Sequence, residues 1–205
     1  MKLDDLKRPL DIEYVDFRIQ SINKGGFAVL LAYKNARVDM ERLDEVCGPE
    51  NWQRDHKEYK GNIYCGIGIK CNDEWVWKWD AGAESFSDKE KGEASDSFKR
   101  AGFNWGIGRE LYNYPFIQIK LHSDEFKVEG DRAKQTWKLK LKEWDWVMRF
   151  DHNVKQLVGI DQNGRIRFIH ASDIKELENI WSLFPDKHSD ESFKNYIKEL
   201  KAQLS

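Results

Sequence analysis

The sequence predicts an α+β fold in which antiparallel hairpins alternate with amphipathic helices. Several short segments alternate apolar and polar residues with the period of two of half-buried strands, and turn residues join them in pairs. Other segments repeat apolar residues every three or four positions, which is the spacing of one helical face. The chain of 205 residues is 40% hydrophobic and 34% charged, a composition typical of ordered globular proteins.

The first part of the chain is expected to form a short helix, a hairpin and a longer helix. Residues 1–10 predict a short helix or arm that Pro9 ends. Alternating residues on both sides of an Asn-Lys-Gly-Gly turn predict a hairpin over residues 12–33. An apolar face then predicts a helix over residues 36–47, with Asn35 as its N-cap and Gly48 and Pro49 after its end.

A second hairpin follows, and its strands differ in character. The strand over residues 63–69 carries Gly66 and Gly68 on one face, so that another element or a ligand must approach this bare face closely. The returning strand places three tryptophans on one face, where they could belong to the core or act as platforms for stacked bases. These tryptophans are Trp75, Trp77 and Trp79.

After Lys120 the sequence becomes polar and charged, and we divide the chain into domains of residues 1–120 and 121–205. Residues 122–135 are polar and are expected to form a linker or a mobile loop. Alternating stretches over residues 136–150 shift register near Lys142, which indicates a bend. An Asn-Gly turn then predicts a hairpin over residues 157–169.

Two helices are expected to complete the C-terminal domain. They cover residues 174–184 and 189–204, and the second carries a narrow apolar stripe. This stripe either docks another molecule or packs on its own domain. Its members are Phe193, Ile197 and Leu200 or Leu204.

Composition and motifs argue against several classes of protein. The net charge of −2 gives no basic half that would indicate nucleic-acid binding by the whole molecule. The three cysteines have no CxxC spacing, and the chain has no P-loop, HExxH or GxSxG motif, so we expect no catalytic residue, metal or cofactor. The N-terminus lacks a signal core and no apolar run could span a membrane, which predicts a cytoplasmic protein.

The central helix has an apolar face and a basic face. A capping box of Ser87 and Glu90 begins it. Its apolar face consists of Ala94, Phe98, Ala101, Trp105 and Gly108. The candidate binding residues are Lys91, Ser95, Lys99 and Arg100 on a second face, Arg37 on the earlier helix and Arg109 beyond the helix. Such a row of cations suits a phosphodiester backbone, but it is also what a solvated helix face pairing with Glu93 and Asp96 would show.

Four blocks of sequence resemble the Sak-type phage single-strand annealing proteins, which are the phage branch of the Rad fifty-two/twenty-two recombination superfamily. The most specific block combines KWDAGAES with KGEASDSFKRAGFNWGIGRELY. The others are FRIQSI, YKNARVDMERLDEVCGPENW and CGIGIKCNDEWVWKWD. They occur in the family's order over about residues 11–115, and the likeness does not extend to residues 121–205.

The resemblance implies a curved antiparallel sheet packed on the central basic helix, in a subunit that assembles into rings. It also implies that Trp75, Trp77 and Trp79 belong to the core of the sheet and are not a stacking platform. In such rings single-stranded DNA lies in a groove with its backbone inward and its bases outward. Lys99 and Arg100 match groove residues, as do Lys91, Ser95 and Arg37. Near Phe103, eukaryotic relatives carry another basic residue.

The resemblance therefore implies a DNA-binding protein and not an enzyme. It would anneal complementary single strands without ATP, in homologous recombination and double-strand break repair, and would act in the host-cell cytoplasm if it is phage-encoded. The alternatives are a single-strand-binding module that stacks bases on tryptophans and a metal-dependent nuclease that uses Asp80, Glu84, Asp88 or Glu90. Partners considered for the C-terminal region are a host single-strand-binding protein, a phage exonuclease and a neighbouring subunit.

Overall fold

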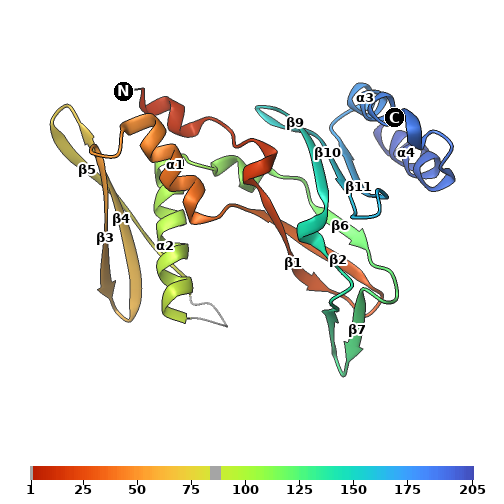
Figure 1. The fold of residues 1–205 in the computed structure, drawn as a ribbon, viewed down its shortest axis with the longest axis horizontal. Helices are drawn as coiled ribbons and strands as arrows, with labels where there is room; N and C mark the ends of the chain where they lie inside the picture. Colours follow the sequence, from red (N-terminus) through yellow and green to blue (C-terminus); the bar gives the residue numbers. More distant parts are fainter. Residues whose placement is uncertain (1, 84–88) are drawn as a thin grey trace. The chain divides into compact units, whose positions relative to one another are not determined.

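A computed structural model describes residues 2–83 and 89–205, without the side chains of residues 89–91 (Figure 1). The chain forms two compact units, Met1–Asp16 with Tyr33–Tyr112, and Phe17–Ala32 with Asn113–Ser205. Residues 17–32, which belong to an early hairpin, thus group with the later part of the chain, and the division into domains at residue 120 stays a prediction. The predicted α+β class with antiparallel sheets is confirmed. In the part of the chain that is described, no helix has the length and apolar character needed to span a membrane.

Unit 1 consists of two helices and a three-stranded antiparallel sheet with the strand order β3-β4-β5. Its elements are the 3-10 turns η1 (Leu3–Lys7) and η2 (Ile12–Tyr14), α1 (Ala36–Cys47), β3 (Trp52–Tyr59), β4 (Asn62–Cys71), β5 (Glu74–Ala81) and α2 (Lys89–Trp105), followed by η3 (Arg109–Asn113). The predicted cap of α1 is confirmed, because the Asn35 side chain accepts a hydrogen bond of 2.8 Å from the Arg37 N–H. The capping box predicted at Ser87 lies outside the described residues.

The core of unit 1 joins the apolar face of α2 to one face of β4. Phe98, Ala101 and Trp105 are buried on α2, as the sequence predicts, and they share a cluster with Ile67 and Ile69. The Trp105 indole N–H donates a hydrogen bond of 3.0 Å to the Ile67 carbonyl. This bond ties the helix to the middle of the sheet and fixes which way α2 faces.

The tryptophans of β5 lie on the opposite face of the sheet, so the prediction that they form its core is wrong. Gly66 pairs with Trp79 and Gly68 with Trp77 across the ladder. A Cβ atom at Gly66 would lie 2.5 Å from the Trp79 ring, and one at Gly68 would lie 2.7 Å from the Trp77 ring. The two indoles therefore cover the bare glycine face themselves. Trp75 is 40% exposed at the end of this row.

β3 was not predicted, because its sequence carries no apolar alternation. Most of its residues are charged or polar and seven of its eight residues are exposed. It pairs with β4 along its whole length. A strand at the edge of a sheet needs only backbone pairing on one side, and charged side chains protect its other edge from association.

A buried ion pair stands between α1 and the C-terminal part of α2. The Lys34 ammonium donates to the Asp39 carboxylate, and both side chains are almost fully buried. Burial raises the pKa of Asp39 to about 6 and lowers the pKa of Lys34. A side chain at Gly102 would collide with the Asp39 carboxylate, which explains a glycine inside α2. The pair therefore requires close contact between the two helices.

Unit 2 contains two three-stranded antiparallel sheets and a separate hairpin. The first sheet has the order β1-β2-β6, and the other has the order β11-β10-β9. The elements are β1 (Asp16–Ile22), β2 (Phe27–Tyr33), β6 (Ile117–Lys120), β7 (Phe126–Glu129), β8 (Arg132–Gln135), the 3-10 turn η4 (Leu141–Glu143), β9 (Asp145–Asp151), β10 (Asn153–Ile160) and β11 (Ile166–Ala171). The predicted hairpins β1-β2 and β10-β11 are confirmed, whereas β6 is too short to show a pattern.

Two predictions for residues 122–150 need correction. Residues 122–135 are not a linker, because β7 and β8 form a hairpin whose turn uses Gly130 at a φ of 62°. Residues 137–141 are not a strand. The bend predicted near Lys142 is present as η4, after which β9 begins.

The last two helices pack on the β9–β11 sheet. They are α3 (Ile174–Leu183) and α4 (Glu191–Leu204), with the 3-10 turn η5 (Pro185–Lys187) between them. Phe193 is buried among residues of α3 and β11, and Ile197, Leu200 and Leu204 pack against the same cluster. The apolar stripe of α4 therefore packs on its own unit, which is one of the two predicted possibilities.

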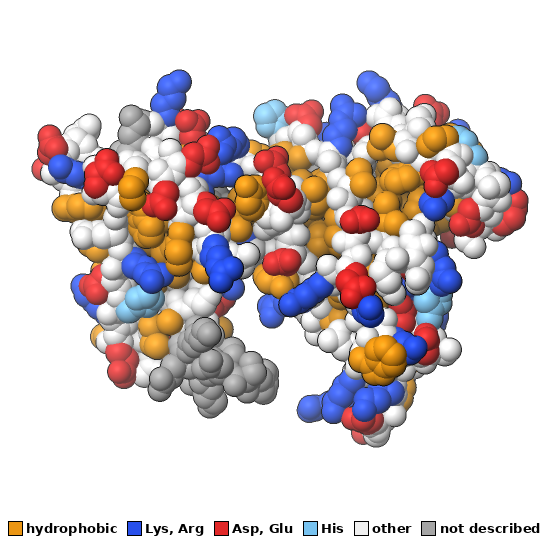
Figure 2. All heavy atoms as spheres, in the orientation of Figure 1, with side chains coloured by type: hydrophobic (Ala, Val, Ile, Leu, Met, Phe, Trp, Pro, Cys, Tyr) orange, Lys and Arg blue, Asp and Glu red, His pale blue; other side chains and the backbone are white. Residues whose placement is uncertain are grey.

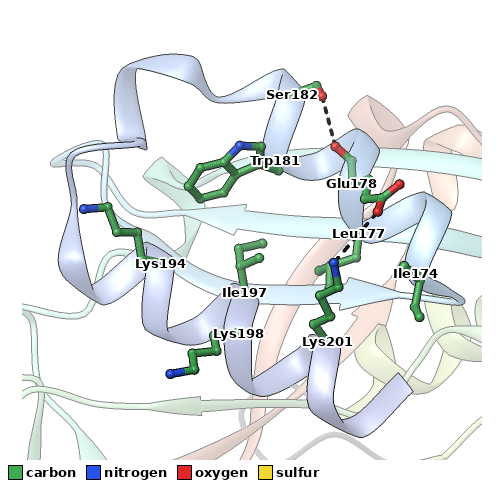
Figure 3. A pocket seen from close by; sticks show the side chains of 9 residues that line it. All are labelled: Ile174, Leu177, Glu178, Trp181, Ser182, Lys194, Ile197, Lys198 and Lys201. Carbon is green, nitrogen blue, oxygen red and sulfur yellow. Dashed lines mark hydrogen bonds and ion pairs between the residues drawn. The ribbon is translucent and has the colours of Figure 1, made fainter. Parts of the chain in front are cut away.

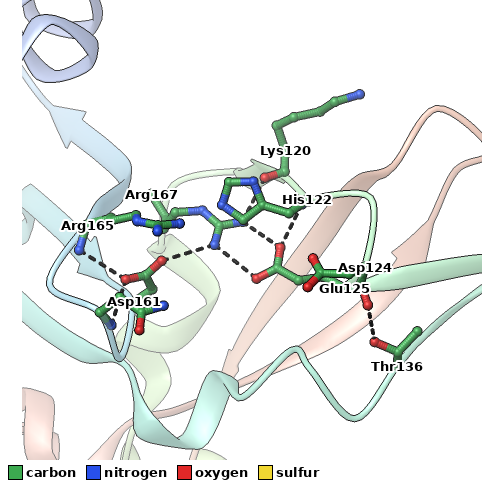
Figure 4. A network of polar contacts seen from close by, with 9 residues as sticks. Lys120, His122, Asp124, Glu125, Thr136, Asp161, Arg165 and Arg167 are labelled. Atoms are coloured by element: carbon green, nitrogen blue, oxygen red, sulfur yellow. Dashed lines mark hydrogen bonds and ion pairs between the residues drawn. The ribbon is translucent and has the colours of Figure 1, made fainter.

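A buried polar network fastens the loop after β6 to the β10–β11 hairpin (Figure 4). The Arg167 guanidinium donates to Glu125 at 2.8 Å, to Asp161 at 3.3 Å and to the Lys120 carbonyl at 2.9 Å. All three charged side chains are at most 7% exposed. Each carboxylate also accepts a backbone N–H, from His122 in one case and from Asn163 and Arg165 in the other.

Neutralising only one member of the Lys34–Asp39 pair should destabilise unit 1 strongly. Lys34→Met leaves the Asp39 charge buried without its partner and should lower the free energy of unfolding at pH 7 by about 3–5 kcal/mol. The double variant Lys34→Met/Asp39→Asn removes both charges and should recover most of this loss. Urea denaturation followed by tryptophan fluorescence measures both. Equal losses in the single and double variants would contradict this explanation.

The Arg167 network should make unit 2 sensitive to acid. Burial by itself raises the pKa of Glu125 and of Asp161, but hydrogen bonds from Arg167 and from backbone N–H groups outweigh it, so both pKa values are lowered. The unfolded chain then binds more protons at acid pH. The network's stabilisation is complete above the unfolded carboxyl pKa of about 4 and is lost as the pH falls below it.

Glu125→Gln should therefore cost about 1.5–3 kcal/mol of unfolding free energy at pH 7 and make stability less dependent on pH below 4. Thermal unfolding measured from pH 7 to pH 3 tests this. Asp124→Asn, which alters an exposed neighbouring carboxylate, is the control and should keep the pH dependence of the natural protein. An identical acid profile for the two variants would argue against the network as the cause.

Candidate nucleic-acid interface

The setting of α2 directs its basic residues away from the core. Because Phe98, Ala101 and Trp105 face the sheet, Lys99 and Arg100 stand on the remaining surface of the helix, with side chains 24% and 46% exposed. Figure 2 shows basic and acidic side chains interspersed over the visible face of the molecule. With a net charge of −2, binding of a polyanion must depend on a local group of cations.

Arg100 is held by a carboxylate that leaves part of its guanidinium available. Its Nε donates to Asp80 Oδ1 at 3.2 Å, and the Asn104 amide supports the other carboxylate oxygen at 3.3 Å. Asp80 also accepts a hydrogen bond from the Ala81 N–H at 2.8 Å. Within the described residues, neither Nη of Arg100 donates a hydrogen bond. The guanidinium is therefore oriented by β5 and keeps terminal donors for another acceptor.

Lys99 has a looser partner, in agreement with the alternative of a helix face that pairs with local acids. Its ammonium lies 3.7 Å from Asp96 Oδ1, and such a partly exposed pair contributes little to stability. Glu93 does not take part, since its carboxylate is buried and accepts the Ile63 N–H at 2.6 Å. Lys99 also lies near enough to the buried Lys34–Asp39 pair to influence both of their pKa values, which locates it at the contact with α1.

The other predicted contacts are distributed around these two residues. Arg37 is exposed in the first turn of α1, and Ser95 is half-buried on α2, one turn before Lys99. The backbone of Lys91 belongs to α2, but its side chain lies outside the described residues. Exposed or partly exposed cations thus lie on α1 (Arg37) and on α2 (Lys99 and Arg100). These are the two helices that contact each other beside the buried Lys34–Asp39 pair.

Arg109 has a structural role that the sequence did not indicate. Its guanidinium donates to the Phe103 carbonyl at 2.7 Å and to the Asn104 carbonyl at 3.3 Å. Lys78 of β5 donates to the same Asn104 carbonyl at 2.9 Å, and its ammonium lies 4.2 Å from the centre of the Trp105 ring. Cations at these carbonyls complement the negative end of the helix dipole.

A cation from another part of the chain lies over the ring of Phe103. The Lys34 ammonium lies 4.5 Å from the centre of the Phe103 ring, and the Tyr112 ring lies 5.2 Å from it. A positive charge is thus present beside this position, although its side chain comes from the segment before α1. Sequence reasoning missed Lys34, because a lysine in a loop gives no sign that it will be buried.

Metal binding and thiol chemistry both depend on particular groups of the described residues. Among them no group of three or more His, Cys, Asp or Glu side chains could hold a metal ion. Asp80, one of the acids considered for a nuclease, is engaged by Arg100 and Asn104; Glu84, Asp88 and the Glu90 side chain lie outside the described part. Burial raises the pKa of the Cys47 and Cys65 thiols to about 11, which makes both poor nucleophiles.

The outer face of the β3–β5 sheet is a second surface with suitable chemistry. Trp77 and Trp79 stack on each other with ring centres 5.6 Å apart, and the Lys57 ammonium lies 4.3 Å from the centre of the Trp79 ring. Both indoles are half-buried, and Trp75 beside them is 40% exposed. Aromatic rings with a nearby cation are the ingredients of a base-stacking surface.

Comparison with known proteins identifies a relative and a family. The chain is 31% identical over 122 residues to the single-stranded DNA-binding protein DdrA of Deinococcus radiodurans. This match covers 56% of the chain and 58% of that relative, so the chain spans less than two thirds of the relative's length. The family model described as "Rad52/22 family double-strand break repair protein" matches residues 3–127, which include both helices of unit 1 and its whole sheet. The chain therefore belongs to the Rad52/22 family of double-strand break repair proteins.

Proposed function

We propose that this protein binds single-stranded DNA and anneals complementary strands without ATP, in recombination and double-strand break repair. The single observation that carries the proposal is Arg100, which α2 and Asp80 hold at the surface with its terminal donors directed to no described acceptor. Membership of the Rad52/22 family and the single-stranded DNA-binding relative support it. The phage branch and a location in the cytoplasm, or in the host cytoplasm, remain part of the proposal.

The proposed contact is between phosphate groups and the cations of the two helices. Arg100 supplies a forked donor and Lys99 a compact charge, and Arg37, Ser95 and Lys91 extend this row. The pairs of Lys99 with Asp96 and of Arg100 with Asp80 are partly exposed, so phosphate oxygens can share or replace these carboxylates at small cost. Such contacts carry no base sequence information.

Annealing by this route requires no catalytic residue. Base pairing supplies the free energy, and the protein has to neutralise backbone repulsion and leave the base edges accessible. We propose that residues 1–120 perform this task and that several copies form a ring, which would join the few cations of each subunit into a continuous belt. The exposed Trp75 and the outer edge of β5 are the surfaces we propose for contacts between copies.

A non-annealing module that stacks bases on tryptophans is the second candidate. The observation that favours it is the outer aromatic layer of Trp75, Trp77 and Trp79 beside Lys57. The annealing proposal uses the helices that cover one face of the β3–β5 sheet, and the stacking module would use the opposite face of this sheet. Variants on one face therefore distinguish them from each other.

Removing the two best-placed cations should weaken DNA binding and its dependence on salt. Lys99→Ala/Arg100→Ala should reduce affinity for a labelled oligo(dT) by about tenfold or more. It should also lower the slope of log affinity against log salt by roughly 1.4, because each single-strand phosphate contact contributes about 0.7. Fluorescence anisotropy from 50 to 300 mM NaCl measures both quantities.

The control for this experiment is Lys142→Ala/Arg165→Ala, which removes two exposed cations of unit 2. It should change affinity less than twofold. If the α2 variant behaves like this control while Trp75→Ala abolishes binding, the aromatic face and not α2 holds the DNA.

Annealing itself is tested with two complementary strands that carry a donor and an acceptor fluorophore. Without ATP, the natural protein should accelerate duplex formation by about tenfold or more over the rate of the strands alone, and Lys99→Ala/Arg100→Ala should lose most of this acceleration. A non-complementary strand is the control. A protein that coats both strands without faster pairing would be a binding module and would refute the annealing proposal.

A further inference from the structure

The two C-terminal helices enclose a groove with an apolar floor and a rim of lysines (Figure 3). It has a volume of about 450 Å³ and lies between α3 and α4. Leu177, Trp181 and Ile197 contribute apolar surface from both helices. The groove lies beyond the residues that the family model matches, so it is a feature of this chain's own C-terminal region.

Three lysines follow one edge of the groove. Lys194, Lys198 and Lys201 are spaced by four and three residues, which places them on the same face of α4. Seven residues of helix extend over about 10 Å, which is the length of three or four residues of an extended peptide. The groove therefore suits a short segment and not a folded domain.

These lysines are incompletely neutralised. Lys194 pairs with Glu191 at 2.6 Å, whereas Lys201 lies 4.0 Å from Glu178. Lys198 is exposed and makes no ion pair with any described residue. Among the described residues, Glu178 is the one acidic residue that lines the groove beside three lysines, so its rim has a net positive charge.

The aromatic side chain of the groove is already held in place. The Trp181 ring is stacked on the His188 ring with centres 3.9 Å apart and is parallel to the Phe193 ring at 5.4 Å. These stacks leave less of its flat surface for a nucleobase and hold it as a rigid apolar wall. The rim also offers ammonium groups and no arginine fork, so it favours carboxylates on an apolar chain over a nucleic acid.

We propose that this groove is a docking site for a short acidic peptide segment of another protein, whose large apolar side chains enter between α3 and α4 while its carboxylates contact Lys194, Lys198 and Lys201. Hydrophobic burial supplies affinity, and the lysine row selects acidic partners and accelerates their association. This docking does not depend on DNA binding by α2.

The test uses the full chain and a fluorescein-labelled peptide of sequence Gly-Asp-Leu-Asp-Asp-Phe-Asp-Leu-Gly in an anisotropy titration. The peptide should bind in a saturable, salt-sensitive manner. Lys198→Glu should weaken binding about tenfold, because the new carboxylate faces those of the peptide. Lys142→Glu makes the same change of charge at an exposed site away from the groove and should alter affinity less than twofold.

Reversing the charges of the peptide tests whether binding depends on the lysines of the groove. A peptide with lysine in place of every aspartate should fail to bind the natural protein and should bind the Lys198→Glu variant better. The proposal is overturned if both peptides bind the natural protein equally or neither binds. It is also overturned if Lys198→Glu lowers oligo(dT) affinity as much as Lys99→Ala/Arg100→Ala does, or if it abolishes self-association on dilution, since the occupant would then be DNA or a second copy.

Discussion

The contact of α2 with β4 determines the arrangement of unit 1. Once Phe98, Ala101 and Trp105 are buried against Ile67 and Ile69, the rotation of the helix about its axis is fixed. The opposite helix surface must then carry Lys99 and Arg100. In the sheet, alternation with a period of two places every residue that does not face α2 on the other side, and this sends the tryptophans of β5 outward. One packing interaction thus creates both surfaces that are proposed to meet DNA.

The second constraint is the buried Lys34–Asp39 pair, which lies beneath the helix surface that carries Lys99. Its burial disfavours both charges, and the attraction between the two groups opposes this cost. Lys99 lies close to this pair, and Phe103 contacts Lys34. The cations proposed to bind phosphate therefore stand on a rigid support. A binding site gains from such rigidity, because less conformational entropy is lost when the ligand binds.

Unit 2 uses different interactions for its own stability. The Arg167 network joins the loop after β6 to the β10–β11 hairpin, while α3 and α4 cover the β9–β11 sheet with a separate apolar cluster. The stripe of α4 takes part in this packing, and one of its members, Ile197, also lines the groove between the two helices. The lysine-rimmed groove between the two helices lies in the region outside the family match and is the surface that we propose for a partner.

The sequence by itself determined the elements with a strong local signal. Hairpins with Asn-Gly or Gly-Gly turns, the capped helix α1 and the apolar face of α2 depend on neighbours in the chain, and a resemblance of four blocks indicated the family. Elements without local signals needed the tertiary structure: β3 is held by β4, and β7 and β8 hold each other. Only the fold could show that Lys34 is buried, that Arg109 caps α2 and that Trp77 and Trp79 cover Gly68 and Gly66. Each of these depends on which residues the fold brings together, and periodicity along one segment contains no information about its partner.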